Sequence, residues 1–145
     1  MPSLNAKIPR KERVMDEQGK NILIVDDDSS IQELLRIILS KHGYQVFQAT
    51  DGEEGVRKFL EIQPDLVVSD ISMPKGDGFN VAILIRSKEE SLGRRIPILL
   101  ISAFYDDHAN QENAARCGAD AFLSKPFTQK QLIEKVQALL EPNGG

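Results

Sequence analysis

Short apolar runs rich in β-branched residues alternate with segments of helical periodicity along most of this 145-residue chain. The runs at 22–25, 66–68 and 97–101 are apolar throughout, as expected for strands that are covered on both faces of a parallel sheet. Five strand–helix units in succession predict a single α/β domain, a five-stranded parallel sheet with helices on both faces.

Capping and helix-ending residues mark the boundaries of the predicted helices. Asp28 is among the capping residues before the first helix, and Gly43 is placed to end that helix. The first helix should bury one face, which is formed by Ile31, Leu34, Leu35, Ile38 and Leu39. The other predicted strands are 45–49 and 121–123, and the other predicted helices are 52–63, 79–89, 107–117 and 128–140.

Polar residues follow the apolar runs where the carboxyl ends of parallel strands should meet. Asp26 and Asp27 follow the first strand, Asp70 the third, Ser102 the fourth and Lys125 the fifth. In sheets of this kind the functional site lies beyond those ends. Clustered carboxylates need a counter-charge, which Mg²⁺ supplies through oxygen ligands, and a carboxylate can also act as a nucleophile toward phosphorus.

Each of these residues also has a simpler interpretation on its own. An aspartate after a strand often caps a helix, a serine is often a loop hydroxyl, and a lysine before proline is often solvated. The carboxylate of Asp70, at the end of a buried strand, is harder to explain in this way. The combination of all of them at successive strand ends favours a site for phosphoryl chemistry.

Four motifs resemble the receiver domains of two-component signalling systems. They are ILIVDD at 22–27, DLVVSDISMPKGDG at 65–78, ILLISA at 98–103 and GADAFLSKPF at 118–127. The resemblance runs from about residue 21 to residue 140. It implies the flavodoxin-like (βα)₅ fold of the chemotaxis response regulator, with strand order 2-1-3-4-5.

The resemblance also implies a role for each matching residue. Asp70 would be the phosphoacceptor, Lys125 the phosphate-binding lysine, and Ser102 the hydroxyl that moves with Phe122 when the domain switches. A Mg²⁺ or Mn²⁺ ion would be held by Asp26, Asp27, Asp70 and the backbone carbonyl of Ser72. The Lys125–Pro126 bond would be cis.

Composition indicates where the protein is located in the cell and which classes of partner it is expected to bind. The net charge of −4 argues against direct nucleic-acid binding, and no apolar run is long enough to span a membrane. The single cysteine, Cys117, excludes an internal disulfide and favours a reducing compartment, so we expect a cytoplasmic protein. Residues 1–20 are expected to be a flexible extension, 21–141 the receiver domain, and 142–145 a short tail.

The predicted function is that of a phosphoacceptor module rather than an enzyme, catalysing only its own phosphorylation and dephosphorylation. Its expected partners are a sensor histidine kinase or phosphotransfer protein and an effector that contacts 107–117, 121–123 and 128–140, with a homodimer as a further option. Whether the module acts alone or belongs to a longer regulator stays open. The alternative from another class is a metal-dependent phosphohydrolase with an aspartyl nucleophile, which would be expected to carry a second aspartate at position 72, where this chain has serine.

Overall fold

A computed structural model describes residues 19–71, 78–102, 112 and 116–141 of the chain. Its elements, in order, are β1 (Asn21–Val25), α3 (Ser29–Lys41), β2 (Gln45–Ala49), α4 (Gly52–Ile62), β3 (Leu66–Asp70), α5 (Gly78–Leu92), β4 (Ile98–Ser102), β5 (Ala121–Ser124) and α7 (Gln129–Leu140). The helix expected at 107–117 lies mostly outside the described residues.

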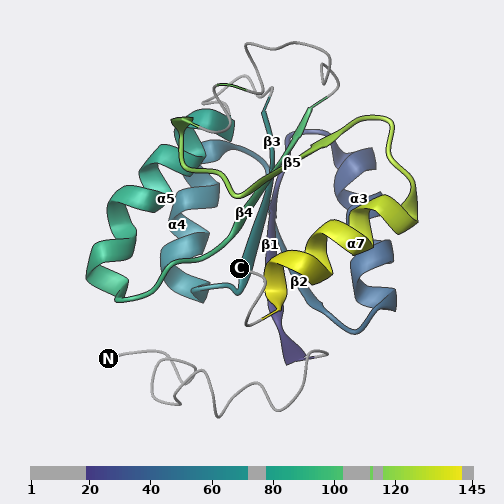
Figure 1. Ribbon diagram of the computed structural model, residues 1–145, viewed down its shortest axis with the longest axis horizontal. Coiled ribbons are helices and arrows are strands. Elements are labelled where there is room, and N and C mark those ends of the chain that lie inside the picture. Colours follow the sequence, from purple (N-terminus) through teal and green to yellow (C-terminus); the bar gives the residue numbers. More distant parts are fainter. Residues whose placement is uncertain (1–18, 72–77, 103–111, 113–115, 142–145) are drawn as a thin grey trace.

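The five strands form one parallel sheet, as the sequence pattern predicted, in the order β2-β1-β3-β4-β5 that the family resemblance implied. Helices α3 and α7 cover one face and α4 and α5 cover the other (Figure 1). Because successive residues of a strand point to opposite faces, Ile22 and Ile24 pack toward α3 and α7, whereas Leu23 and Val25 pack toward α4 and α5.

Helix boundaries follow the expected capping chemistry. The Asp28 side chain accepts hydrogen bonds from the backbone amides of Ser30 and Ile31 at the start of α3, and Gly43 follows its end with φ of +91°. At the start of α7, Thr128 and Gln131 form a reciprocal capping box. Among the described helices, none is both long and apolar enough to cross a membrane.

The buried face of α3 differs from the prediction at two positions. Leu34, expected in the core, is 45 % exposed, whereas the polar Gln32 is buried. The apolar spacing alone could not decide this, because the part of α3 that is buried depends on how the helix packs against β1 and β2 rather than on which of its residues are apolar. Leu35, Ile38 and Leu39 are buried as expected.

Candidate functional site

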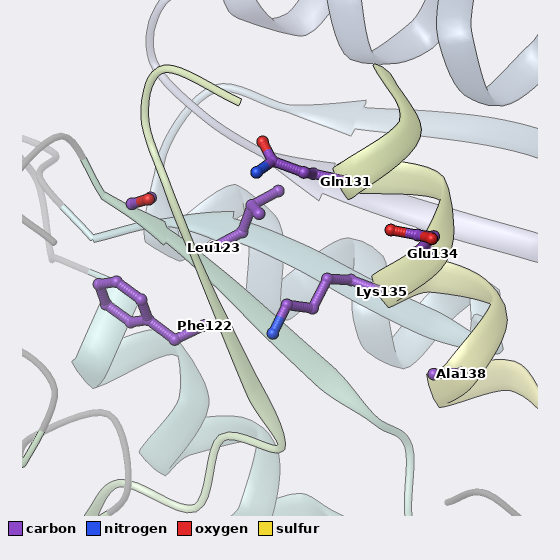
Figure 2. A pocket seen from close by; sticks show the side chains of 7 residues that line it. Phe122, Leu123, Gln131, Glu134, Lys135 and Ala138 are labelled. Atoms are coloured by element: carbon purple, nitrogen blue, oxygen red, sulfur yellow. The ribbon is translucent and has the colours of Figure 1, made fainter. Parts of the chain in front are cut away.

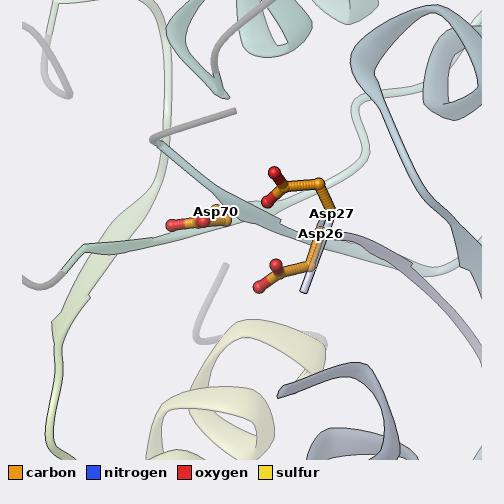
Figure 3. A group of neighbouring side chains, drawn as sticks. All are labelled: Asp26, Asp27 and Asp70. Atoms are coloured by element: carbon orange, nitrogen blue, oxygen red, sulfur yellow. The ribbon is translucent and has the colours of Figure 1, made fainter. Parts of the chain in front are cut away.

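Three aspartates meet at the carboxyl ends of β1 and β3. Asp26 and Asp27 directly follow β1, and Asp70 is the last residue of β3. The strands are adjacent and parallel, so their ends coincide, and one carboxylate oxygen from each residue lies within 4.8 Å of the other two (Figure 3). Asp26 and Asp70 are buried and Asp27 is exposed, which leaves the cluster open to solvent on one side.

Lys125 brings the positive charge to this cluster. Its Nζ lies 3.7 Å from Asp70 Oδ1 and 4.0 Å from Asp26 Oδ2. The lysine follows β5, and its backbone amide donates to the Ser102 carbonyl oxygen at 2.7 Å, which ties the end of β5 to the end of β4. The Lys125–Pro126 peptide bond is cis, as the family resemblance implied.

Ser102 ends β4 and is fully buried. It lies one position beyond Ile101, the residue that pairs with Asp70 across the neighbouring strands. The side chain is therefore on the strand next to the predicted phosphoacceptor, as expected.

Burial raises the pKa of the Asp26 carboxyl from 3.8 to about 6. The hydrogen bond from the Asp28 amide and the charge of Lys125 act in the opposite direction, and the charges of Asp70 and Asp27 add to the increase. Burial, the largest cause, destabilises the charged form of Asp26, and a divalent cation held by the carboxylates would stabilise that form.

The backbone of Asp70 is packed against the start of α5. A Cβ atom on Gly78 would lie 2.4 Å from the carbonyl oxygen of Asp70, which is closer than such atoms approach in folded proteins. The Gly78 amide donates to the Ile71 carbonyl oxygen at 3.0 Å. Glycine at this position therefore allows the helix to begin directly against the strand end.

Phe122 lies on β5. It is half-buried and lines a groove between β5 and α7 together with Leu123, Gln131, Glu134, Lys135 and Ala138 (Figure 2). The groove belongs to the surface on which we expected an effector to bind.

The structure brings together Asp26, Asp27, Asp70 and Lys125, four of the residues predicted for the site. Ser72, predicted to offer its carbonyl oxygen, lies outside the described residues. Sequence reasoning missed Gln32, whose buried side-chain amide reaches the backbone of Asp26. A polar residue at the helical spacing of buried Leu35 and Leu39 was the signal that could have identified it.

The sequence matches the model of the response regulator receiver domain family over residues 22–137. It is 39 % identical to the DNA-binding dual master transcriptional regulator RpaA of Synechocystis over 82 % of this chain and 48 % of that protein. It is 37 % identical to the alkaline phosphatase synthesis transcriptional regulatory protein PhoP of Bacillus subtilis, over 84 % of this chain and 49 % of PhoP. The chain spans about half the length of the curated relatives that it matches.

A solved receiver-domain structure with a similar fold contains a metal ion. The receiver domain of the sensor histidine kinase PA1611 from Pseudomonas aeruginosa PAO1 has a magnesium ion coordinated in its active-site cleft. It aligns with a TM-score of 0.76 and 30 % identity over 84 % of this chain and 98 % of that one. Sheet order, the acidic cluster and the family match agree, and this chain belongs to the response regulator receiver domains of two-component signalling systems.

Proposed function

We propose that Asp70 accepts a phosphoryl group from a phosphohistidine of a sensor histidine kinase or phosphotransfer protein. The observation that carries this proposal is the buried carboxylate of Asp70 at a strand end, within reach of the Lys125 ammonium. A carboxylate oxygen of Asp70 forms the new bond to phosphorus. The phosphorus–nitrogen bond to the donor histidine breaks, and its electron pair stays on the imidazole, which takes up a proton.

The side chains of Asp26, Asp27 and Asp70 would hold Mg²⁺ or Mn²⁺, and the Ser72 carbonyl oxygen is proposed as a further ligand. The fit is supported by the donor set, because among the described residues three clustered carboxylates face one lysine ammonium, and hard divalent cations bind oxygen ligands. Burial is the main cause of the raised pKa of Asp26, and a bound ion would stabilise the charged form of this carboxyl. When bound, the ion supplies electrostatic stabilisation of the transferred phosphoryl oxygens.

Lys125 and Ser102 are proposed to contact the phosphoryl group once it is on Asp70. Lys125 offers a cation and Ser102 a hydroxyl donor from the adjacent strand. Movement of Ser102 toward the group would let Phe122 move inward, and this would change the surface formed by 107–117, β5 and α7. We propose that surface, including the groove in Figure 2, as the site for an effector or for a second copy of the chain.

Residues 21–141 are proposed as the functional unit, with 1–20 and 142–145 as extensions. The catalysis is limited to the domain's own phosphorylation and dephosphorylation. The single cysteine favours a reducing compartment, so we propose the cytoplasm as the location.

Acetyl phosphate with Mg²⁺ tests the acceptor, with intact-mass spectrometry as the measurement. The wild type should gain the mass of one phosphoryl group, and Asp70→Asn should gain none. Asp51→Asn is the matched control, because Asp51 also follows a strand but caps α4, a role that asparagine retains. Labelling of Asp70→Asn equal to that of the wild type, or steady turnover of p-nitrophenyl phosphate, would contradict the proposal.

A further inference from the structure

The side chain of Gln32 is a buried amide in an otherwise apolar stripe of α3. Its Nε2 donates one hydrogen bond to the carbonyl oxygen of Asp26 at 2.6 Å and another to that of Ala49 at 2.7 Å. Both amide hydrogens are thus used on the backbone at the carboxyl ends of β1 and β2. Gln32 therefore links the first helix to the loop that carries the acidic pair.

The position of this contact matters because the Asp26 carbonyl belongs to the peptide group that joins Asp26 to Asp27. The Asp26 amide still pairs with β2, donating to Ala49 O at 3.0 Å, but the next peptide leaves the sheet. Holding its carbonyl oxygen fixes the plane of that peptide. The plane in turn sets the directions in which the side chains of Asp26 and Asp27 leave the backbone.

Two further hydrogen bonds join the acidic loop to the first turn of α3, so that these contacts form a closed ring. The Asp28 amide donates to Asp26 Oδ1 at 2.8 Å, and the Gln32 amide donates to the Asp28 carbonyl oxygen at 3.0 Å. The first turn of α3 and the acidic loop are therefore held to each other from both sides. Within this ring, the Gln32 side chain is the member that reaches the peptide between the two aspartates.

From this geometry we propose that Gln32 is a positioning residue for the divalent cation, acting through the backbone of Asp26 and Asp27. The proposal rests on the function proposed above, in which those carboxylates hold the ion. The side-chain amide satisfies the carbonyl oxygens of Asp26 and Ala49, so its loss should lower the stability of the domain. It also orients the loop that carries the two aspartates, and residues that orient metal ligands commonly change metal affinity by about 10- to 100-fold.

Gln32→Met is the test variant, because methionine has a similar length and removes both donors. Lys58→Met is the matched control. Lys58 Nζ donates to the carbonyl oxygen of Gln48, the residue before Ala49, and so supports the same end of β2 without contacting Asp26. Titration calorimetry with Mg²⁺ measures the affinity, and urea unfolding in EDTA measures the stability of the metal-free domain.

Gln32→Met should weaken Mg²⁺ binding about tenfold, while Lys58→Met should bind Mg²⁺ as the wild type does. A purely structural role would lower the stability in EDTA but leave the Mg²⁺ affinity unchanged, and an unchanged affinity would overturn the inference. If Gln32→Met does not fold, Gln32→Asn replaces it, since the shorter amide cannot span both carbonyl oxygens and should also weaken binding.

The same titrations distinguish a failure of the positioning role of Gln32 from a failure of the proposed metal site. Mg²⁺ binding by the wild type that is lost in Asp27→Ala supports the proposed site, whether or not Gln32 affects it. Wild-type affinity in the Gln32 variant would then overturn the positioning role alone. No Mg²⁺ binding by the wild type would overturn both.

Discussion

Replacing Asp26 by asparagine removes a negative charge whose burial destabilises the folded domain. Burial raises the pKa of this carboxyl from 3.8 to about 6. At about 1.4 kcal/mol for each pH unit, ionisation of Asp26 lowers the free energy of unfolding by about 3 kcal/mol above pH 6. Asparagine keeps the oxygen that accepts from the Asp28 amide, so Asp26→Asn should stabilise the metal-free protein by about that amount.

The sign of the pH dependence follows from the direction of the shift. The folded state binds the Asp26 proton more tightly than the unfolded chain does, so the wild type loses stability as the pH rises from about 4 through 6. The advantage of Asp26→Asn should therefore be about 3 kcal/mol at pH 7.5 and fall to about 1 kcal/mol at pH 4.5.

Urea unfolding in EDTA, followed by far-ultraviolet circular dichroism at both pH values, measures this difference. Asp28→Asn is the control, because it makes the same chemical change at an exposed N-cap, where asparagine and aspartate act equally well. An Asp26→Asn variant that is no more stable than the wild type at the higher pH would refute the reasoning. So would an advantage of equal size at the two pH values.

Magnesium should reduce the advantage of Asp26→Asn. An ion that binds only the folded state stabilises it by about 2.7 kcal/mol at a concentration 100 times its Kd. The wild type should gain this stabilisation in full, and Asp26→Asn should gain less because it offers one carboxylate fewer. An equal gain in the two proteins would show that Asp26 does not contribute to binding the ion.

Three further substitutions test how the fold supports the site. Gly78→Ala places a Cβ 2.4 Å from the Asp70 carbonyl oxygen. We therefore expect the free energy of unfolding in urea to fall by about 1–3 kcal/mol and phosphorylation by acetyl phosphate to slow. Unchanged stability would mean that α5 can shift to make room for the added atom. Arg86, on α5, donates to the carbonyl oxygens of Gly118 and Ile96 and pairs with Glu89 and Asp120. Arg86→Met should therefore cost about 3 kcal/mol of unfolding free energy, against about 1 kcal/mol or less for the exposed Arg95→Met, and equal losses would contradict this. Ser102→Ala should still be phosphorylated on Asp70 but should show a smaller NMR shift at Phe122 on addition of beryllofluoride with Mg²⁺, and a shift as large as in the wild type would refute the proposed coupling.

The order of elements was predictable because hydrophobic periodicity is a local property of the chain. Runs such as 22–25 and 66–68 specify strands by their own composition, and the cap Asp28 specifies where the first helix begins. Connectivity then required the strands to be parallel, which placed Asp26, Asp70 and Lys125 at one edge of the sheet before any distance was known.

Only the tertiary structure decided which polar groups are buried there and what they contact. The exposure of Leu34, the burial of Gln32 and the raised pKa of Asp26 all depend on how much of α3 and of the loop after β1 the neighbouring elements cover. The Arg86 contacts likewise join α5 to the turn before β5, more than 30 residues further along the chain. Local sequence determines which residues lie on the same face, whereas desolvation and hydrogen bonding depend on neighbours that only the folded chain brings into contact.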